Sequence, residues 1–446
     1  MSRGGASILQ GSIFVALTKF SIPILFSLIL QALYGAVDLW MVSRFGITAD
    51  VSAVSTGSQT MLIVTGLITG LAMGVTVLLG QAVGEGNDQR SAHIIGTSLW
   101  VFGGVALMLT VLLLLGAPAL TGVLHAPAEA FDKTIHYMRI CGLGTLFVVG
   151  FNVFSSIFCG LGDAKTPLIF VMIACIFNIL GDYILIAHFD LGTVGAALAT
   201  VLAQAISVVT AVGLLKKRLP FRLERQHFVL EPALFAGIFK LGTPVALLRM
   251  CNEVSYLLII GFVNTLGVVA SSGVGIAEKL VMFILLIPTA YMSAVSAFVA
   301  QNTGAGQHPR AKRCLWVGMA TAAVVGGVFF YISFFHGDTL SALFISDGPV
   351  IQASAEFLKA TALECLILSL AYCYDGYFNG IGKTTFVMVQ GILAALCVRI
   401  PYAYYASTRP DHSLFNIGLS TALAAAFMLI VCTVYYCWWT RKTTHS

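Results

Sequence analysis

Two side chains that could bind a cation or a proton stand in one apolar stretch, PLIFVMIACIFNILGDYILIA, from Pro167 to Ala187. Asn178 and Asp182 are four residues apart, so a helix would place them on one face. The stretch is long enough to cross a bilayer core of about 30 Å at about 1.5 Å per residue. A carboxylate at that depth costs at least about 2.5 kcal/mol, which a proton, a metal cation, a cationic ligand or a buried partner must offset.

A hydrogen bond that packs two helices is the simplest explanation for Asp182. We favour a cation or proton site, because acids inside membrane spans usually mark ion paths. A second acid, Asp38, lies in another apolar stretch of the N-terminal half, where no Lys or Arg lies at comparable depth. The apolar stretches of this half also carry neutral polar groups whose oxygens suit a hard cation: Gln31, Tyr34, Asn152, Ser155, Ser156, Asn178 and Thr200.

The C-terminal half carries both signs of charge in its apolar stretches: Glu253, Glu278, Glu364, Asp375, Arg249, Lys279 and Arg399. Arg249 and Glu253 are four residues apart and could pair along one helix face. We therefore expect this half to be largely self-neutralised. The alternative is that Glu253 or Asp375 faces the pathway as a second cation or substrate site.

The composition is that of a polytopic membrane protein. Of 446 residues, 58% are hydrophobic and 10% are charged, whereas soluble proteins carry about 25% charged residues. The first apolar run, from Ser12 to Val42, is too long for a signal peptide. The ten cysteines form no Cys-x-x-Cys pair, which predicts reduced core residues. The net charge of +5 is assigned to loops that face anionic lipid, not to nucleic-acid binding. No enzyme motif is present, so we expect no catalytic activity.

Hydropathy predicts that twelve helices position these side chains. The expected spans are 13–42, 52–80, 95–123, 135–159, 167–187, 193–214, 234–263, 269–300, 315–335, 353–379, 385–407 and 416–438. Pro23 and Pro244 fall inside the first and seventh spans and should bend them. The long polar connection from Lys216 to Glu231 lies near the midpoint of the chain, and we expect a solvated tether or a segment that lies on anionic lipid.

This midpoint separates two related halves. Three motifs of the first half recur 220 or 221 residues later: Lys19–Pro23 as Lys240–Pro244, Gln81–Gly86 as Gln301–Gly306, and Phe158–Gly162 as Phe378–Gly382. The chain is therefore predicted to be an all-α membrane protein of two homologous six-helix bundles. Because six is even, both halves enter the membrane from the same side, and a pseudo-twofold axis lies along the membrane normal. The predicted lobes are residues 1–222, ending in the basic linker, and residues 223–446.

The distribution of positive charge predicts the orientation, because cytoplasmic loops carry an excess of Lys and Arg. The termini and even-numbered loops contain fourteen of the 24 Lys and Arg residues, against three, Arg44, Lys133 and Arg409, in the odd-numbered loops proper. Both termini are therefore predicted to be cytoplasmic.

These features together resemble the multidrug and toxic compound extrusion (MATE) family. The resemblance rests on Asp38 in the first span, Asn178 with Asp182 in the fifth, Gln301–Gly306 after the eighth, Gly160–Pro167 after the fourth, and Arg399-Ile-Pro in the eleventh. It covers nearly the whole chain and looks closest to the prokaryotic branch that includes DNA-damage-inducible-F-like members.

The resemblance implies two lobes with alternating access that export cationic drugs across the cytoplasmic membrane against inward Na⁺ or H⁺, with no other cofactor. It places the cation site on Asp38, Asn178 and Asp182, with Thr200 at a matching distance. Asn152 or Ser155 is expected to supply the amide of the fourth span. Small cationic molecules and membrane lipids are the expected partners, and a monomer is the expected state.

Three questions stay open at this point. Asp38, Asn178, Asp182, Thr200 and a water or backbone oxygen could serve Na⁺, whereas a proton needs only one acid, so either ion fits. A lipid-linked precursor flippase of the same superfamily is an alternative, but it should show cationic residues that bind a pyrophosphate, and the N-terminal interior is acidic. A channel or sensor is a third reading, and a large conductance would reveal it.

Overall fold

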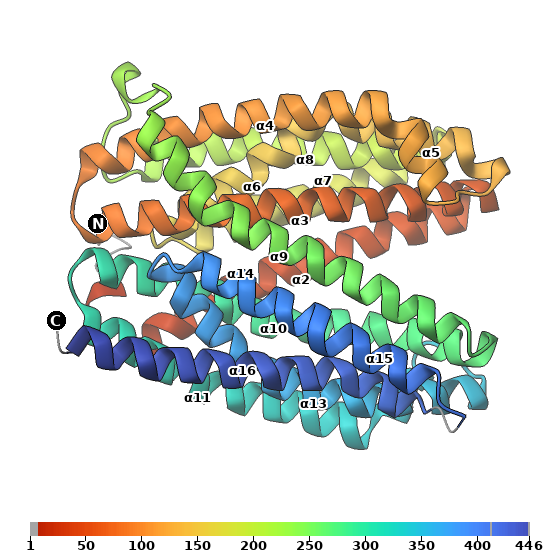
Figure 1. Cartoon of the computed structure of the whole chain (residues 1–446). Coiled ribbons are helices and arrows are strands. Elements are labelled where there is room, and N and C mark those ends of the chain that lie inside the picture. Colours follow the sequence, from red (N-terminus) through yellow and green to blue (C-terminus); the bar gives the residue numbers. More distant parts are fainter. Residues whose placement is uncertain (1–7, 411–412, 445–446) are drawn as a thin grey trace. The chain divides into compact units, whose positions relative to one another are not determined.

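The computed structural model of the protein describes residues 8–410 and 413–444, and these residues contain helices and no strand. Figure 1 shows the helices along the chain. In the first part they are α2 (Ile13–Phe45), α3 (Thr48–Gly84), α4 (Asp88–Val123), α5 (Ala128–Leu143), α6 (Thr145–Gly160), α7 (Lys165–Asp182), the π-helix η1 (Tyr183–His188), α8 (Gly192–Arg218) and η2 (Arg225–His227). In the second part they are α9 (Pro232–Asn264), α10 (Val268–Gly304), α11 (His308–Phe335), α12 (Gly337–Ala342), α13 (Gly348–Gly380), α14 (Thr384–Leu393), the π-helix η3 (Ala394–Arg399), α15 (Ile400–Ser407) and α16 (Leu414–Thr444).

The apolar helices match the predicted membrane spans. Within the described residues, eleven helices are long and apolar enough to cross a membrane, counting α7 with η1 and α14 with η3 and α15 as one span each. The bent pair of α5 and α6 supplies a twelfth when it is counted as one span. The prediction of an all-helical membrane protein with this number of spans is confirmed.

The fourth span is broken where the sequence predicted one helix. The axes of α5 and α6 meet at 51° at Gly144. A Cβ atom on Gly144 would lie 2.3 Å from Cγ2 of Val201, so α8 approaches the backbone too closely for any other residue. Thr110 of α4 donates a hydrogen bond to the carbonyl of Gly142 beside the break, at 3.0 Å. The bend between α5 and α6 is therefore accompanied by tertiary contacts with α4 and α8, which a hydropathy profile cannot predict.

Repeated glycines end the equivalent helices of the two halves. Gly86 and Gly306 follow α3 and α10, and both have φ +70°. Gly162 and Gly382 follow α6 and α13, with φ +82° and +80°. This left-handed conformation disfavours a side chain, and glycine after a helix end adopts it readily. The repeated motifs therefore encode matching helix ends in both halves.

The chain divides into two compact units whose boundaries lie inside helices. Of the described residues, the first unit, which we call the N-unit, contains 8–9 and 22–246, and the second, the C-unit, contains 10–21, 247–410 and 413–444. One boundary falls in α2 directly before Ile22, next to Pro23, and the other falls in α9 after Ala246, two residues beyond Pro244. The start of α2 thus belongs with the C-unit and the start of α9 with the N-unit. The predicted lobe boundary at 222/223 lies in the linker instead.

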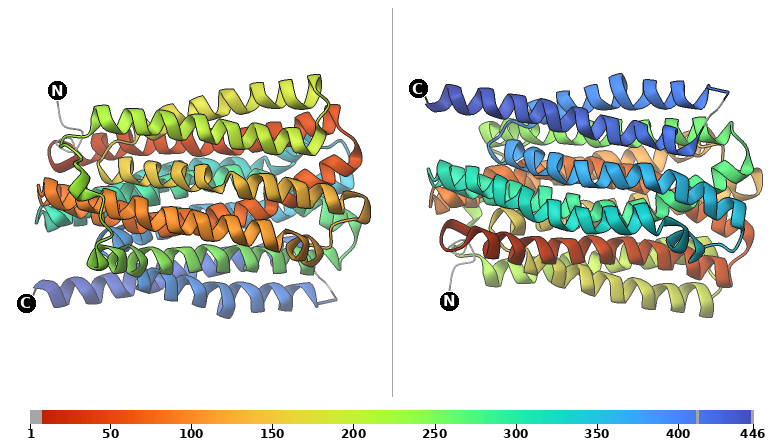
Figure 2. Two further views of the ribbon diagram at one scale, coloured as in Figure 1. Left: turned by 90° about the horizontal axis from the view of Figure 1, so that it is seen from above. Right: turned by 90° about the horizontal axis from the view of Figure 1, so that it is seen from below.

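Within each unit the long helices run side by side (Figure 2). In the N-unit α7 packs along α8, and α3 packs on α5 and α6. Its apolar core includes the fully buried Ile68, Leu79, Ile94, Leu113 and Phe170. In the C-unit α13 packs on α10, α11 and α16. Asn178, Asp182 and Thr200 project from α7 and α8 of this packing, and Asp375 projects from α13.

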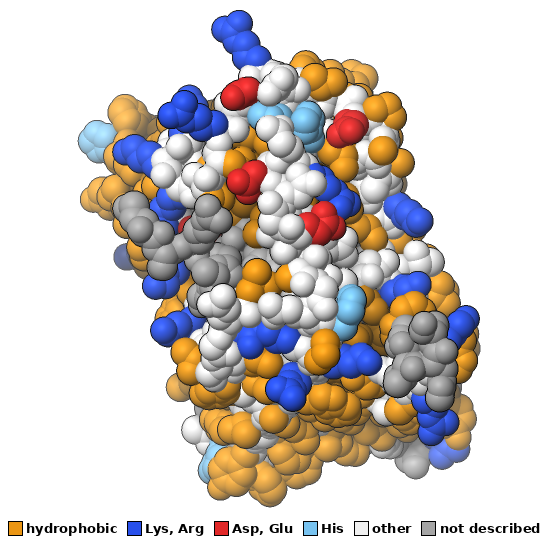
Figure 3. Space-filling model, turned by 90° about the vertical axis from the view of Figure 1, so that its left-hand side faces the viewer, with side chains coloured by type: hydrophobic (Ala, Val, Ile, Leu, Met, Phe, Trp, Pro, Cys, Tyr) orange, Lys and Arg blue, Asp and Glu red, His pale blue; other side chains and the backbone are white. Residues whose placement is uncertain are grey.

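The linker between α8 and α9 is largely exposed, as expected of a solvated segment, but its last residues dock on α4. Thr97 Oγ1 donates to the carbonyl of Val229 at 3.1 Å, and Trp100 Nε1 donates to that of Phe228 at 3.0 Å. His227 is buried, with Nε2 2.9 Å from Gln89 Oε1. Backbone carbonyls held by side chains of α4 fix the linker to the N-unit. Figure 3 shows this end of the molecule, where Lys and Arg outnumber Asp and Glu on the visible face.

Candidate ion-binding site

The N-unit site is built where α7 changes into a π-helix. Asn178 and Asp182 lie in the last two turns of α7, and η1 begins at Tyr183. Short π-helical segments inside α-helices often occur at functional sites. Both side chains are buried, with exposed fractions of 1% and 0%. The predicted spacing of four residues thus places them together in the interior of the unit.

A chain of contacts joins α7 to α2 through α8. Asn178 Nδ2 lies 3.5 Å from Thr200 Oγ1, and Thr200 Oγ1 donates to Asp38 Oδ2 at 3.1 Å. Asp38 projects from α2 and is buried. The structure therefore brings together Asp38, Asn178 and Thr200, which the sequence places on three separate spans.

Asp182 completes this group without receiving a hydrogen bond. The carboxyl groups of Asp38 and Asp182 are close enough to act on each other electrostatically, and two carboxyl groups so placed can share one proton. Within the described residues no donor reaches Asp38 Oδ1, Asn178 Oδ1 or either carboxylate oxygen of Asp182. Four buried oxygen atoms thus lack a donor. Such oxygens are costly unless they bind a proton or a cation.

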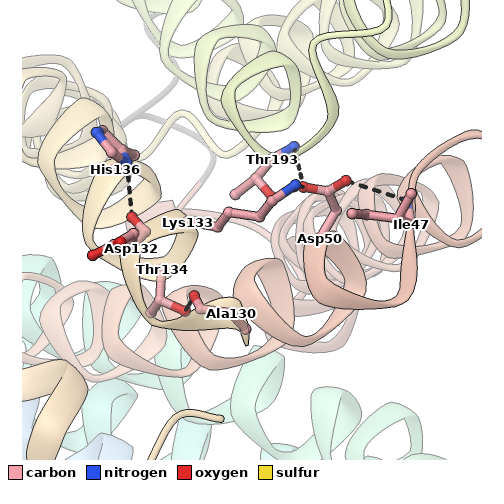
Figure 4. Close-up of polar contacts among 8 residues, drawn as sticks. All are labelled: Ile47, Asp50, Ala130, Asp132, Lys133, Thr134, His136 and Thr193. Carbon is pink, nitrogen blue, oxygen red and sulfur yellow. Dashed lines mark hydrogen bonds and ion pairs between the residues drawn. The ribbon is translucent and has the colours of Figure 1, made fainter. Parts of the chain in front are cut away.

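Another buried acid of the same unit shows how a structural carboxylate is satisfied (Figure 4). Asp50 Oδ1, at the start of α3, lies 2.6 Å from Lys133 Nζ of α5 and 2.6 Å from Thr193 Oγ1 of α8. Its Oδ2 accepts from the backbone N–H of Ile47 at 3.2 Å. Sequence analysis did not single out Asp50, because its partners lie 83 and 143 residues away. Among the residues that the structure describes, Asp38 and Asp182 have no such cationic partner.

Asn152, the fourth-span amide, makes its hydrogen bonds elsewhere. Its Nδ2 donates to the carbonyl of Val148 at 2.8 Å, and its Oδ1 accepts from Thr69 Oγ1 at 3.2 Å. These contacts tie α6 to α3 and do not include Asp38 or Asp182.

A small packing void, without room for a water molecule, adjoins the site between α2, α7 and α8. Its lining includes Tyr34, Asn178, Thr200 and Gln204. Gln204 Nε2 lies 3.4 Å from Tyr34 Oη, and no described donor reaches Gln204 Oε1. Gln204 follows Thr200 by one helical turn, a spacing from which sequence analysis could have identified it. Gln204 Oε1 thus adds one more oxygen without a described donor beside Asn178 and Thr200.

The two candidate acids of the C-terminal half are not brought together by any hydrogen bond. Glu253 is exposed on α9. Asp375 is buried on α13, where Oδ1 accepts from Gln390 Nε2 at 3.0 Å. Arg249 and Glu253, which could pair by their spacing, form no ion pair in direct contact within the described chain, although the two charges act on each other electrostatically.

The remaining buried acid of this half, Glu364, accepts a hydrogen bond from Tyr256 Oη at 2.8 Å. Arg399 contacts an amide, Asn252, and not a carboxylate. The expected self-neutralisation therefore does not arise from direct ion pairs with Arg249 or Arg399.

The N-unit arrangement suits a monovalent ion. Asp38 and Asp182 supply the charge, and Asn178 and Thr200 supply neutral oxygens. Carboxylate, amide and hydroxyl oxygens are ligands for hard cations, and paired carboxyl groups can equally hold a proton. Across the described residues no group of three His, Cys, Asp or Glu side chains is placed to hold a metal ion. The chemistry available is reversible binding of a small cation or of a proton.

Sequence relatives of this chain are multidrug resistance and multidrug export proteins of similar length. It is 24% identical over 443 residues to the "Probable multidrug resistance protein YoeA" of Bacillus subtilis, covering 97% of this chain and 96% of that protein. It is 25% identical over 429 residues to the "Multidrug export protein MepA" of Staphylococcus aureus strain NCTC 8325, covering 95% and 94%.

Solved structures share the fold. A crystal structure of MATE in the bent conformation has a TM-score of 0.92 at 18% identity, covering 100% of this chain and 98% of that one. The straight conformation of MATE has a TM-score of 0.89 at 19% identity, covering 100% and 99%.

The family model named MatE matches twice, at residues 23–184 and 244–405. Both ends of the second match lie 221 residues after those of the first, which confirms the predicted repeat. The two matches together span most of the chain. The protein therefore belongs to the MatE family, whose members are membrane transporters and not enzymes.

Proposed function

We propose that the protein exports organic cations across the cytoplasmic membrane in exchange for inward Na⁺ or H⁺, by alternating access. The observation that carries this proposal is the pair of buried acids, Asp38 and Asp182, which lie within reach of each other and have no cationic partner. Relatives described as multidrug export and multidrug resistance proteins support an amphipathic organic cation as cargo.

Coupling requires that ion binding shift the balance between two conformations. The acids can supply the difference in ion affinity between the two conformations, because two nearby buried carboxylates favour whichever conformation admits a cation or a proton. Na⁺ would be held by Asp38, Asp182, Asn178 and Thr200, whereas H⁺ would be shared by the two acids alone. The inward ion then favours the conformation that releases the drug outside.

The orientation and the assembly belong to the same proposal. Both termini lie in the cytoplasm, and the excess of Lys and Arg in the loops between repeats supports this. The chain acts as a monomer, because each half supplies one of the two bundles that the repeat requires.

A proteoliposome assay tests the proposal with a fluorescent cation as cargo and with the Na⁺ and pH gradients imposed separately. Efflux should depend on at least one of the two gradients and should be lost in Asp38→Asn and Asp182→Asn. Glu85→Gln is the matched control, because Glu85 is a partly exposed acid that pairs with Arg90 at the surface of the same unit. Efflux that ignores both gradients, or that survives both Asn substitutions, would refute the proposed coupling site.

A further inference from the structure

A cavity of about 330 Å³, which we call the α11–α13 pocket, lies where α11 ends beside α13 in the C-unit. These two helices pack side by side (Figure 1). Side chains of both helices and of the short α12 between them line the pocket: Phe334, Phe335, Asp338, Gln352, Glu356 and Lys359. Gln352, Glu356 and Lys359 are four and three residues apart, so α13 presents them on one face. The volume is within the range of small-molecule sites, about 300–1,000 Å³.

One wall of the α11–α13 pocket is aromatic and continues onto the exposed surface of α11. The ring centroids of Phe334 and Phe335 are 5.1 Å apart, and that of Tyr331 lies 5.2 Å from Phe335. Phe335 is 60% exposed and Tyr331 is 57% exposed. Because α11 is a membrane span that ends at Phe335, these rings lie where the hydrocarbon core meets the headgroups. The pocket beside them is therefore at the depth of lipid headgroups.

The other wall carries charges of both signs. Glu356 is held in place, because its Oε1 accepts from Ser413 Oγ at 2.5 Å and from the backbone N–H of Phe415 at 3.5 Å. Asp338, in the first turn of α12, is exposed, and so is Lys359 on α13. Among the residues that the structure describes, no ion pair joins these charges. Two acids and one cation thus line one cavity and are available to a ligand.

This pattern of charge selects the chemistry of the ligand. An organic cation such as the proposed cargo would be attracted by the two acids but repelled by Lys359. A lipid with an anionic headgroup would be attracted by Lys359 but repelled by Asp338 and Glu356. A headgroup that carries an ammonium and a phosphate matches both signs. Because carboxylates accept N–H donors, a primary ammonium fits them better than the trimethylammonium of phosphatidylcholine, which has none.

We propose that the α11–α13 pocket binds the headgroup of phosphatidylethanolamine. The ammonium lies between Asp338 and Glu356, the phosphate contacts Lys359, and the acyl chains lie along Phe335. A bound lipid joins α11, α12 and α13 at this end of the C-unit. The inference goes beyond the proposed function, because it needs neither the cargo nor the ion site; only the assignment of the pocket to the outer leaflet rests on the orientation proposed above.

Two lipids that differ only in the methyl groups of the ammonium test the site. Phosphatidylethanolamine and phosphatidylcholine with the same fluorophore on the same acyl chain are titrated with the purified full-length protein in detergent, and binding is measured by fluorescence anisotropy. We expect the wild type to bind phosphatidylethanolamine about tenfold more tightly, the scale of a charge-assisted hydrogen bond. Glu356→Gln should abolish this preference by weakening phosphatidylethanolamine alone. Lys359→Gln should weaken both lipids, since both carry the phosphate.

Further measurements protect the result from a folding defect. Asp338 is exposed, so Asp338→Asn should leave the fold intact and reduce the preference even if Glu356→Gln unfolds the protein. Asp132→Asn removes an exposed acid of α5 that does not line the pocket, and it should leave both affinities unchanged. Glycerophosphoethanolamine has the headgroup without the acyl chains, and it should compete with the labelled lipid much less well than unlabelled phosphatidylethanolamine does.

Three outcomes overturn the proposal. The first is equal affinity of the wild type for the two lipids. The second is a preference that survives both Glu356→Gln and Asp338→Asn, or that Asp132→Asn reduces as much as they do. The third is competition by glycerophosphoethanolamine as effective as that of the lipid, which would assign the pocket to a soluble molecule. Efflux that ignores both ion gradients would refute the proposed function alone, because lipid binding is measured without a gradient or cargo.

Discussion

Thr200 Oγ1 donates a hydrogen bond to Asp38 Oδ2 at 3.1 Å, and this bond joins α8 to α2. The same oxygen faces Asn178 Nδ2 at 3.5 Å. The hydroxyl therefore orients one carboxylate and one amide at once. A cation that enters the group meets oxygens that are already positioned.

Removing this hydroxyl should weaken ion coupling selectively. Thr200→Val has nearly the same shape but leaves Asp38 Oδ2 without its donor, so we expect the ion dependence of efflux to weaken by about tenfold. Thr200→Ser keeps the hydroxyl and should behave like the wild type. The measurement is the concentration of Na⁺ or H⁺ that gives half-maximal efflux. If the Val variant retained the wild-type value, Thr200 would have no role in the ion site.

Neutralising the site acids should leave the fold intact or stabilise it. Asp38→Asn and Asp182→Asn remove charges that have no cationic partner, with little change in volume, so the burial cost of a carboxylate disappears. We expect the unfolding temperature in detergent to hold or rise while coupled efflux is lost. A fall of several degrees in both variants would show that these acids are structural.

The same substitution at Asp50 should have the opposite effect on stability. Asp50→Asn breaks the contact with Lys133 Nζ at 2.6 Å and weakens the acceptor for Thr193. Because Lys133 is 39% exposed and can turn toward water, we expect a loss of about 1–2 kcal/mol, less than for a fully buried pair. Thermal unfolding of Asp50→Asn beside Asp182→Asn gives the comparison. Matching shifts in the two variants would contradict the division into structural and functional acids.

The docked linker should be released by adding a methyl group to α4. A Cβ on Gly96 would lie 1.8 Å from the carbonyl oxygen of His227, whereas Gly104 of the same helix has open space around it. Gly96→Ala should therefore expose the chain at Arg225 to trypsin, and Gly104→Ala should not. The measurement is the rate at which trypsin cleaves each purified variant at Arg225. Equal resistance in both would mean that the linker does not need the close approach at Gly96.

The orientation can be tested at the linker as well. Arg222→Cys, in a background without the native cysteines, should resist an impermeant thiol reagent applied outside intact cells. The excess of Lys and Arg in this connection predicts that it is cytoplasmic. Disrupted cells should label readily, which controls for access. Rapid labelling of intact cells would invert the topology.

The sequence was sufficient to predict features that depend on spacing within one helix or on one repeated motif. Asn178 and Asp182 share a face because of their spacing, and the glycines at 86 and 306 adopt the same φ because the motif repeats. The approach of Asp38 to Asp182 could only be hypothesised, because it depends on how α2 packs against α7.

Other features depend on contacts between distant segments. The break at Gly144 follows from the proximity of Val201, and Asp50 is neutralised by Lys133 across 83 residues. The docking of His227 depends on the absence of a side chain at Gly96. Neither hydropathy nor local spacing contains this information, because each contact is decided by the packing of two helices or of a helix and a loop.

The position of the unit boundaries has a consequence for how the chain can be divided. The first half of α9 packs so closely on α3 that a Cβ on Gly70 would lie 2.4 Å from Cα of Ala246, and one on Gly74 would lie 2.4 Å from the carbonyl oxygen of Ile238. A fragment ending at residue 222 would lack this segment and leave the glycine surface of α3 uncovered. Each compact unit thus includes a helical segment from the other half of the duplicated chain, an exchange similar to that in a domain-swapped dimer. The two halves are therefore expected to fold as one cooperative protein and not as separable modules, and a split gene would have to be expressed as both pieces together.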